Sequence, residues 1–212
     1  MQRVSARRNL TPSLLIAAFL SVLACSTAAA QPWNWAGPRP DQNMAPDQPG
    51  YVPSASEEQL PGELHKQVVF FRTNEAPGTI IVNTSERFLY LVQGNNRAIR
   101  YGIGVGREGF QWSGLKRIER KAEWPDWTPP PEMIERQPYL PRFMAGGPGN
   151  PMGARALYIG GTVYRIHGTN QPWTIGSAVS SGCFRLTNPD VIDLFDRVPV
   201  GTRVVVLQAR QV

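Results

Sequence analysis

The sequence predicts a mostly β domain with minor α content. Two observations predict this class. Short runs rich in β-branched and aromatic residues follow one another at the spacing of hairpins, and a single segment, residues 188–198, has the apolar period of a helix. Of the 212 residues, 42% are apolar, which suffices for one ordinary core. We therefore expect one folded domain with an N-terminal extension.

Residues 1–30 have the pattern of an export signal peptide. A positive n-region is followed by a short apolar run at residues 14–24 and by an A-x-A cleavage site at residues 28–30; the n-region contains Arg3, Arg7 and Arg8. The apolar run is too short to span a bilayer. We expect an exported protein of the periplasm or cell envelope, with no stable transmembrane span after processing.

Two variants of this signal stay open, and both bear on the cysteines. Residues 22–25 also fit a lipoprotein box in which Cys25 is acylated, and Arg7-Arg8 fits a twin-arginine signal. Either way Cys183 is the one unmodified thiol of the mature chain, in a compartment where paired cysteines normally form disulfides. Cys183 is therefore either an inert core residue or a reactive one.

Residues 31–66 are predicted to form a proline-rich disordered tether. Seven prolines lie among Gln, Asp, Ser and Gly between residues 31 and 62, with no helical or strand period. The folded domain is then expected over residues 67–208.

The domain begins with strand-like runs at residues 68–72, 79–83, 88–93 and 98–105, with a Gly-Asn-Asn turn at residues 94–96. The G-I-G-V-G segment at residues 102–106 has the wrong glycine spacing for a dinucleotide fingerprint, and no helical pattern follows it. It predicts a strand that another backbone approaches closely.

Residues 107–150 are predicted to form a long irregular loop. This stretch is rich in proline and contains W-P-D-W-T-P-P-P at residues 124–131. Loops this long in compact domains are usually functional, so we expect a cleft wall or lid, with Trp127 against the ligand. The alternative is a packed Ω-type loop whose tryptophans are buried.

The C-terminal third predicts three strands and the main helix. Strands are expected at residues 155–159, 162–166 and 203–207, and the second delivers His167 at its end. In the helix, Asn188 is the expected N-cap and Pro189 the first helical residue; the apolar face comprises Val191, Leu194, Phe195 and Val198.

Charge excludes one class of partner. The formal charge of +6 falls to +3 once the three signal arginines are removed, and no basic run is interleaved with aromatic residues. We expect no nucleic-acid binding. A mildly basic exported protein suits an anionic envelope polymer, although +3 is also an ordinary solvated surface.

Cys183 has the neighbours that a nucleophilic cysteine needs. His167 lies sixteen positions before it and is the expected base, because the only other histidine, His65, lies in the tether. The N–H groups of Gly182 and Cys183 are expected to form an oxyanion hole. Arg185, two positions after the cysteine, is expected on the same side, where it lowers the thiol pKa or holds a substrate carboxylate.

The base needs a partner on its second ring nitrogen. No acidic residue occurs between residues 153 and 188, so a nearby backbone carbonyl such as that of Gly168 is the economical choice. The alternative is a buried structural cysteine beside a hydrogen-bonded core histidine.

The pattern H-G-T-N at residues 167–170 followed by S-G-C-F-R-L-T-N at residues 181–188 resembles the signature of the L,D-transpeptidase (YkuD) family. Segments 101–106, 127–133 and 146–158 are also similar to that family, so the resemblance covers about residues 67–208. It implies a β-sandwich of mixed sheets with one main helix after the catalytic cysteine.

The resemblance also implies an activity on peptidoglycan stem peptides. The cysteine thiolate attacks the carbonyl before the terminal D-alanine of a tetrapeptide, D-alanine leaves, and an amine of a neighbouring stem takes the acyl group in a 3-3 cross-link. Carried over, Cys183 is the nucleophile, His167 the base, Gly168 its orienting carbonyl and Arg185 a substrate-positioning residue. Carbapenems are expected to acylate Cys183, and no cofactor or metal is expected.

One position departs from the family pattern and leaves the acceptor open. Many members have His where Ser181 stands, so we expect Ser181 to contact substrate rather than to act as a base. The alternatives are that the same acyl-enzyme attaches envelope proteins to peptidoglycan, or that the domain only binds peptidoglycan without turnover.

Two rival sites are weaker. Residues 113–116 match the S-x-x-K of serine penicillin-binding proteins, but no K-T-G or S-D-N accompanies them. A metal site would have to combine His65, His167 and Cys183 with scattered carboxylates, at none of the usual ligand spacings.

Overall fold

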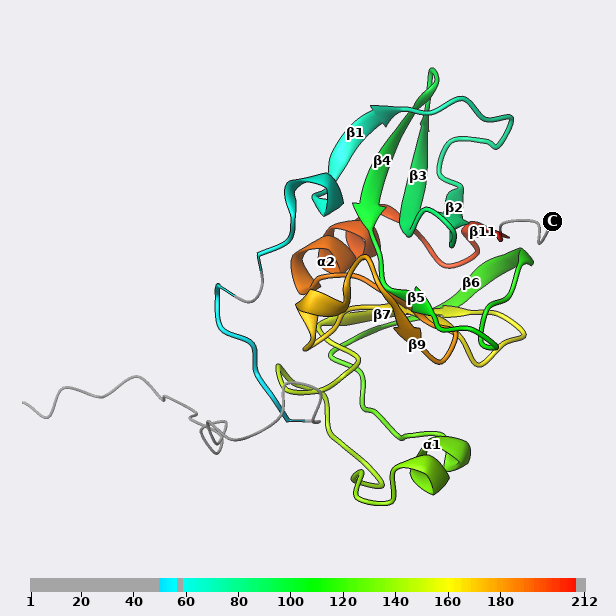
Figure 1. The fold of residues 1–212 in the computed structure, drawn as a ribbon. Helices are drawn as coiled ribbons and strands as arrows, with labels where there is room; N and C mark the ends of the chain where they lie inside the picture. Colours follow the sequence, from blue (N-terminus) through cyan, green and yellow to red (C-terminus); the bar gives the residue numbers. More distant parts are fainter. Residues whose placement is uncertain (1–49, 57–58, 209–212) are drawn as a thin grey trace, which may run out of the picture. The chain divides into compact units, whose positions relative to one another are not determined.

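The computed structural model describes residues 50–56 and 59–208, and it confirms a mostly β fold with one main helix. The elements, shown in Figure 1, are η1 Gly62–Leu64, β1 Gln67–Phe70, β2 Ile80–Asn83, β3 Phe88–Gly94, β4 Arg97–Gly102, β5 Val105–Gly106, β6 Gly114–Glu123, α1 Pro131–Arg136, β7 Arg155–Ile159, β8 Arg165–His167, η2 Pro172–Thr174, β9 Ala178–Ser180, β10 Phe184–Arg185, α2 Asn188–Arg197 and β11 Arg203–Leu207. Within this part of the chain, no helix is long and apolar enough to cross a bilayer. The predicted signal peptide, with Cys25, lies outside the described residues.

Nine strands hydrogen-bond in the order β1-β4-β3-β2-β11-β6-β7-β8-β10, and β5 pairs separately with β9. The pairs β2–β11 and β8–β10 are parallel and the other pairs of the large sheet are antiparallel, so the sheet is mixed as expected. The central strands are almost continuous apolar runs because both of their faces are covered; β2 is buried at three of its four positions.

The hairpin between β3 and β4 forms where the sequence predicts it. Asn95 and Asn96 both have positive φ, 50° and 54°, which a two-residue hairpin turn requires and which asparagine tolerates better than most residues. The run predicted at residues 98–105 is divided, since β4 ends at Gly102 and β5 begins at Val105.

β6 corrects the predicted loop at residues 107–150. This ten-residue strand pairs with β11 through residues 114–117 and with β7 through residues 118–123, so it joins the two halves of the sheet. Only Ile118 is fully buried along it, and four of its ten residues are Lys or Arg. The apolar alternation that identifies a strand is therefore missing from the sequence. The irregular part of the stretch begins after Glu123 and includes α1.

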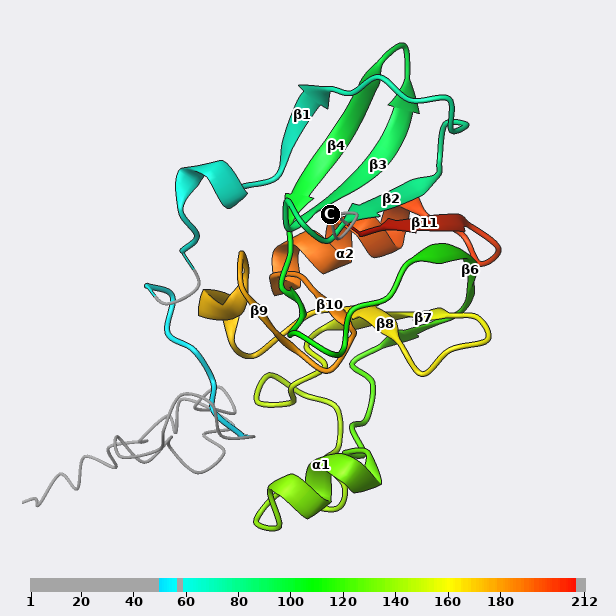
Figure 2. The ribbon, with the colours of Figure 1, turned by 45° about the vertical axis from the view of Figure 1, so that its right-hand side comes forward.

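The strand before His167 is shorter than predicted. Residues 162–166 were expected to be extended, but Thr162 lies in a turn, where its hydroxyl donates to the Ile159 carbonyl and accepts from the Tyr164 N–H. β8 therefore begins at Arg165 and ends at His167 (Figure 2).

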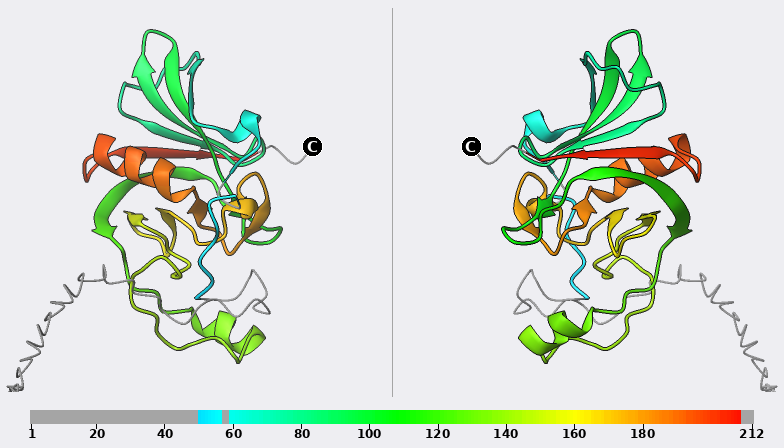
Figure 3. Two further views of the ribbon diagram at one scale, coloured as in Figure 1. Left: turned by 90° about the vertical axis from the view of Figure 1, so that its left-hand side faces the viewer. Right: turned by 90° about the vertical axis from the view of Figure 1, so that its right-hand side faces the viewer.

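α2 buries the predicted apolar face but begins with a different cap. Val191, Leu194 and Val198 belong to one buried cluster with residues from both halves of the sheet. Figure 3 shows α2, in orange, between the green strands β3 and β4 and the yellow strands β7 and β8. The N-cap is Thr187, whose hydroxyl accepts from the Asp190 N–H, so the prediction of Asn188 as the cap is wrong. The Asn188 side chain instead accepts from the Ala154 N–H, which ties the start of the helix to the start of β7.

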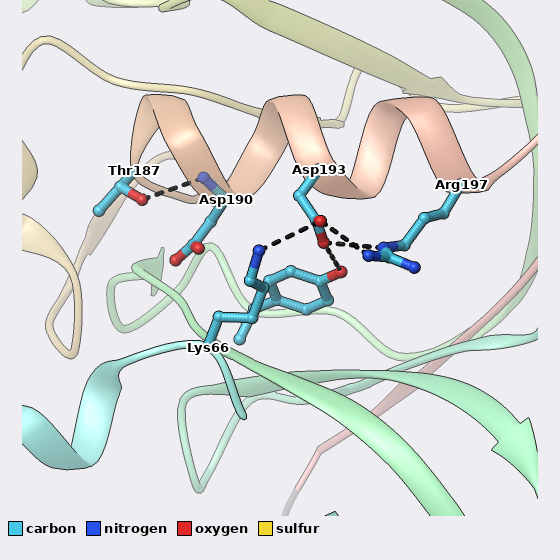
Figure 4. Close-up of polar contacts among 6 residues, drawn as sticks. Lys66, Thr187, Asp190, Asp193 and Arg197 are labelled. Carbon is cyan, nitrogen blue, oxygen red and sulfur yellow. Dashed lines mark hydrogen bonds and ion pairs between the residues drawn. The ribbon is translucent and has the colours of Figure 1, made fainter. Parts of the chain in front are cut away.

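The predicted tether is not separate from the domain throughout its length. Leu64 packs against the backbones of Gly102 and Gly176, and Lys66 forms an ion pair with Asp193 of α2 at 3.1 Å (Figure 4). Asp193 also accepts hydrogen bonds from the Tyr101 hydroxyl and from Arg197. The folded unit therefore begins before residue 67.

Candidate active site

The pairing of β8 with β10 brings the predicted catalytic residues together. These short parallel strands pair Arg185 with His167 and Phe184 with Ile166. Paired residues project from the same face of a sheet, and alternation along the chain places Cys183 on the face of Arg185. Cys183, His167 and Arg185 accordingly line one cavity of about 630 Å³. Phe184 and Ile166, on the opposite face, are buried in the core and hold the pair in place.

His167 is buried and oriented by a backbone carbonyl. Its Nδ1–H donates to the Gly168 carbonyl at 2.6 Å, the contact that the sequence analysis expected, which leaves Nε2 as the unprotonated nitrogen. Burial, assisted by the charge of Arg185, lowers the pKa of His167 from 6.5 to about 3, against the opposing effect of that hydrogen bond. The imidazole is therefore neutral at pH 7 and able to accept a proton.

Arg185 supplies a positive charge beside His167 in the cavity. Its Nη1 donates to the Gln171 side chain at 3.2 Å, and among the described residues its buried Nε has no hydrogen-bond partner. Burial lowers the pKa of Arg185 below its usual range, and the Cys183 sulfur acts in the opposite direction. The backbone of Arg185 exchanges two hydrogen bonds of 2.9 Å with Gly104, in the G-I-G-V-G segment where a close backbone approach was predicted.

The turn that presents Cys183 is held by Ser180. The Ser180 hydroxyl donates to the Cys183 carbonyl at 2.6 Å and accepts from the Gly182 N–H at 3.2 Å. The Gly182 N–H is thus already paired, and of the two predicted oxyanion donors the Cys183 N–H is the remaining candidate. Cys183 is a free thiol of intermediate exposure.

Comparisons with known proteins identify the family of this chain. The profile of the YkuD family, described as the L,D-transpeptidase catalytic domain, matches residues 77–206, more than half of the chain. The chain belongs to the L,D-transpeptidase family. Two curated relatives from Escherichia coli K12, the probable L,D-transpeptidases ErfK/SrfK and YbiS, are each 44% identical over 135 residues. Those residues cover 60% and 59% of this chain respectively.

This L,D-transpeptidase chain spans 43% of the length of each of these two relatives. A solved structure from Brucella melitensis, described as a probable carnitine operon oxidoreductase caia, is 51% identical. That match covers 73% of this chain and 100% of the other, with a TM-score of 0.48.

The two remaining predicted site residues, Ser181 and Trp127, also line this cavity. Ser181 lines it, and its hydroxyl accepts from Arg107 Nη1 at 3.5 Å. Trp127 lines it from the segment between β6 and β7, where it exchanges two backbone hydrogen bonds of 2.8 Å with Met144. Residues from 127 to 140 form one side of the cavity, so this part of the predicted loop is a wall of the site.

Several residues that line the cavity were not predicted from the sequence. Arg107 and Arg165 line the cavity, and Tyr164 lies beneath the Cys183 turn, stacked on Trp112 at a centroid distance of 5.1 Å. Arg165 carried a usable signal, because it lies two residues before His167 on the same strand face.

The rival sites do not assemble. Lys116 pairs with Val204 in the strand that begins at Gly114, and neither Ser113 nor Lys116 lines the cavity. His65 bonds to the Leu60 carbonyl, away from His167 and Cys183. Among residues 50–56 and 59–208, no group of three His, Cys, Asp or Glu side chains is placed to hold a metal ion.

Proposed function

We propose that the chain is a peptidoglycan L,D-transpeptidase in which Cys183 is the nucleophile and His167 the general base. The observation that supports this proposal is that Cys183, His167 and Arg185 line one cavity, with Arg185 paired to His167 in the β8–β10 register. Membership of the family supports the reaction class.

In the acylation step, Nε2 of His167 takes the proton of the Cys183 thiol. The thiolate attacks the stem carbonyl before the terminal D-alanine, and the Cys183 N–H donates to the oxyanion that forms. The imidazolium returns its proton to the leaving amine as the C–N bond breaks. D-alanine departs, and the stem remains bound to Cys183 as a thioester.

In the second step, an amine of a neighbouring stem attacks the thioester. Neutral His167 takes a proton from this amine, the C–S bond breaks, and the new amide forms a 3-3 cross-link. Arg185 lies close enough to influence His167, and its positive charge favours the oxyanion that forms on the attacked carbonyl. The proposed substrate lies outside the cytoplasm, which agrees with the export signal expected over residues 1–30.

The experiment that tests this function compares the purified protein with Cys183→Ala and His167→Ala on sacculi rich in tetrapeptide stems. We expect the protein to release D-alanine and to form 3-3 cross-linked muropeptides. Both variants should lose several orders of magnitude in rate, because the two groups act as a unit. Normal turnover by Cys183→Ala would refute the proposal.

Mass spectrometry provides a covalent control. A carbapenem should add one drug mass to Cys183 of the protein and none to Cys183→Ala. If acylation succeeds and the muropeptides contain stem–protein conjugates in place of 3-3 cross-links, the acceptor is an envelope protein. Binding to peptidoglycan that survives in Cys183→Ala, with no turnover by the unmodified protein, would identify a binding module.

A further inference from the structure

The cavity wall has an unusual charge composition. Four arginines line it, at positions 107, 136, 165 and 185, and none of the residues that line it is Asp or Glu. Guanidinium groups keep their charge in proteins, and His167 is neutral at pH 7. The wall therefore presents four positive charges and no negative one.

These arginines have no carboxylate partner among the described residues. The ion pairs that the structure records there are Lys66–Asp193, Arg155–Glu123, Arg197–Asp193 and Arg203–Glu75, and all lie outside the cavity. A concave site of one sign, with low-dielectric walls, focuses its potential and attracts ligands of opposite charge. The chemistry of the wall thus points to an anionic ligand.

Two of the four charges belong to the reaction centre. Arg165 and Arg185 both act on His167, because the charge of each lowers the pKa of that imidazole. Their place beside the base fits the stabilisation of an oxyanion, as proposed above.

The other two arginines lie together on the side of α1. The guanidinium carbon of Arg107 lies 4.2 Å from the centroid of the Phe110 ring, and that of Arg136 lies 5.8 Å from the same centroid. Arg107 also donates to the hydroxyl of Ser181, two residues before the nucleophile. Two like charges near one ring repel each other, and an anion bound between them would offset this repulsion.

We propose that Arg107 and Arg136 form a carboxylate subsite for the donor stem peptide. Its ligand is a free carboxylate on the part of the stem that stays in the acyl-enzyme, not the carboxylate of the departing D-alanine. A guanidinium binds a carboxylate through charge-assisted, often bidentate, hydrogen bonds. An amide in the same place has no charge and offers one acceptor oxygen instead of two, because its NH2 group cannot accept from a guanidinium. The enzyme therefore prefers stems with free carboxylates over amidated stems. This inference rests on the proposed function, since it names the substrate that the same cavity takes.

The test uses two tetrapeptide donors that differ only in their non-terminal carboxylates, free in one and amidated in the other. We expect the unmodified protein to use the free donor with a kcat/KM about 10- to 100-fold higher. In Arg107→Gln/Arg136→Gln this ratio should fall toward 1 through a rise in KM for the free donor. Higher salt should also reduce the ratio for the unmodified protein.

Arg120→Gln is the matched control. Arg120 is exposed, lies over the Tyr158 ring at 3.5 Å and is outside the cavity, so its replacement removes one charge and one ring contact without touching the subsite. This variant should keep the discrimination of the unmodified protein. A double variant that discriminates as strongly as Arg120→Gln would overturn the subsite.

A binding experiment separates this inference from the proposed function. Calorimetry with Cys183→Ala measures the affinity for both donors without turnover, and adding Arg107→Gln/Arg136→Gln should equalise the two affinities. If the protein turns over both donors equally well, the transpeptidase proposal stands and the subsite proposal is refuted. If binding discriminates between the donors through the two arginines but no donor is turned over, the subsite proposal stands and the transpeptidase proposal is refuted.

Discussion

His167 is kept in one tautomer and one protonation state by its surroundings. The Gly168 carbonyl occupies Nδ1, burial excludes water, and neighbouring guanidinium charge disfavours the imidazolium. His167 is therefore unprotonated at neutral pH, and this state lowers the stability of the folded protein in acid. A histidine held neutral in the folded state still binds a proton in the unfolded chain once the pH falls below its unfolded pKa.

This cost predicts the pH dependence of stability. The folded pKa of His167 is about 3 and the unfolded value 6.5, so its contribution to stability is constant above pH 6.5 and is lost as the pH falls toward 3. One proton bound only by the unfolded chain lowers the free energy of unfolding by up to about 1.4 kcal/mol per pH unit. Denaturant unfolding between pH 4 and 7.5 should show a steeper decline for the unmodified protein than for His167→Gln.

The His167→Gln comparison removes the other titrating groups from the difference. The hydrogen bond from Arg197 lowers the pKa of Asp193, so the contribution of Asp193 to stability is also lost in acid. This loss is the same in both proteins. Parallel pH profiles would contradict a neutral, buried His167.

At the scale of elements, the turn between β9 and β10 determines where the nucleophile lies. Gly182 has a φ of 105°, and a Cβ there would overlap the Tyr164 ring. That ring has little room to move because it stacks on Trp112, whose indole N–H donates to the Gly182 carbonyl at 3.0 Å. Glycine is thus required both by the backbone conformation and by the space available.

Gly182→Ala should therefore impair acylation as well as stability. We expect the carbapenem acylation rate at Cys183 to fall by about 100-fold, because a displacement of about 1 Å at a reacting group has that effect. Gly78→Ala is the control: Gly78 has a similar φ of 85°, but a Cβ there meets no atom within 4 Å. The control should cost only the backbone strain of about 1–2 kcal/mol and acylate normally. Equal acylation by both variants would show that Tyr164 does not position the turn.

The elements predicted from sequence are those with a local signal. β7 and β11 have the predicted bounds because each is a short run rich in apolar residues beside turn residues, which follow β7 and precede β11. β6 was missed because its exposed positions carry Lys, Arg and Glu, and β10 because two residues carry no period. The Cys183 and His167 pair could be proposed from sequence because the candidate residues are few. Arg107 and Arg136 were not found, since only the folded chain brings them to one ring.

At the scale of the whole molecule, the main misjudgement concerns where the folded unit begins. Composition alone predicts a tether over residues 31–66, yet Tyr51, Leu64 and Lys66 have partners far along the chain. The Tyr51 ring meets Trp173 edge-on at 5.6 Å, and the Tyr51 carbonyl accepts from the Asn170 side chain at 3.0 Å. Local composition does not predict contacts between residues this far apart in the chain.

These contacts predict that a chain beginning at residue 67 is impaired and that a chain beginning at residue 50 is not. The shorter chain loses the packing of Leu64 and the Lys66–Asp193 ion pair, a loss of about 2 kcal/mol in the free energy of unfolding. It also loses Tyr51, which supports Trp173 in the cavity wall, so KM for the donor stem should rise more than kcat falls. Denaturant unfolding and steady-state kinetics on both chains measure the two effects. If the two chains prove equally stable and equally active, residues 50–66 are a passive extension despite their contacts.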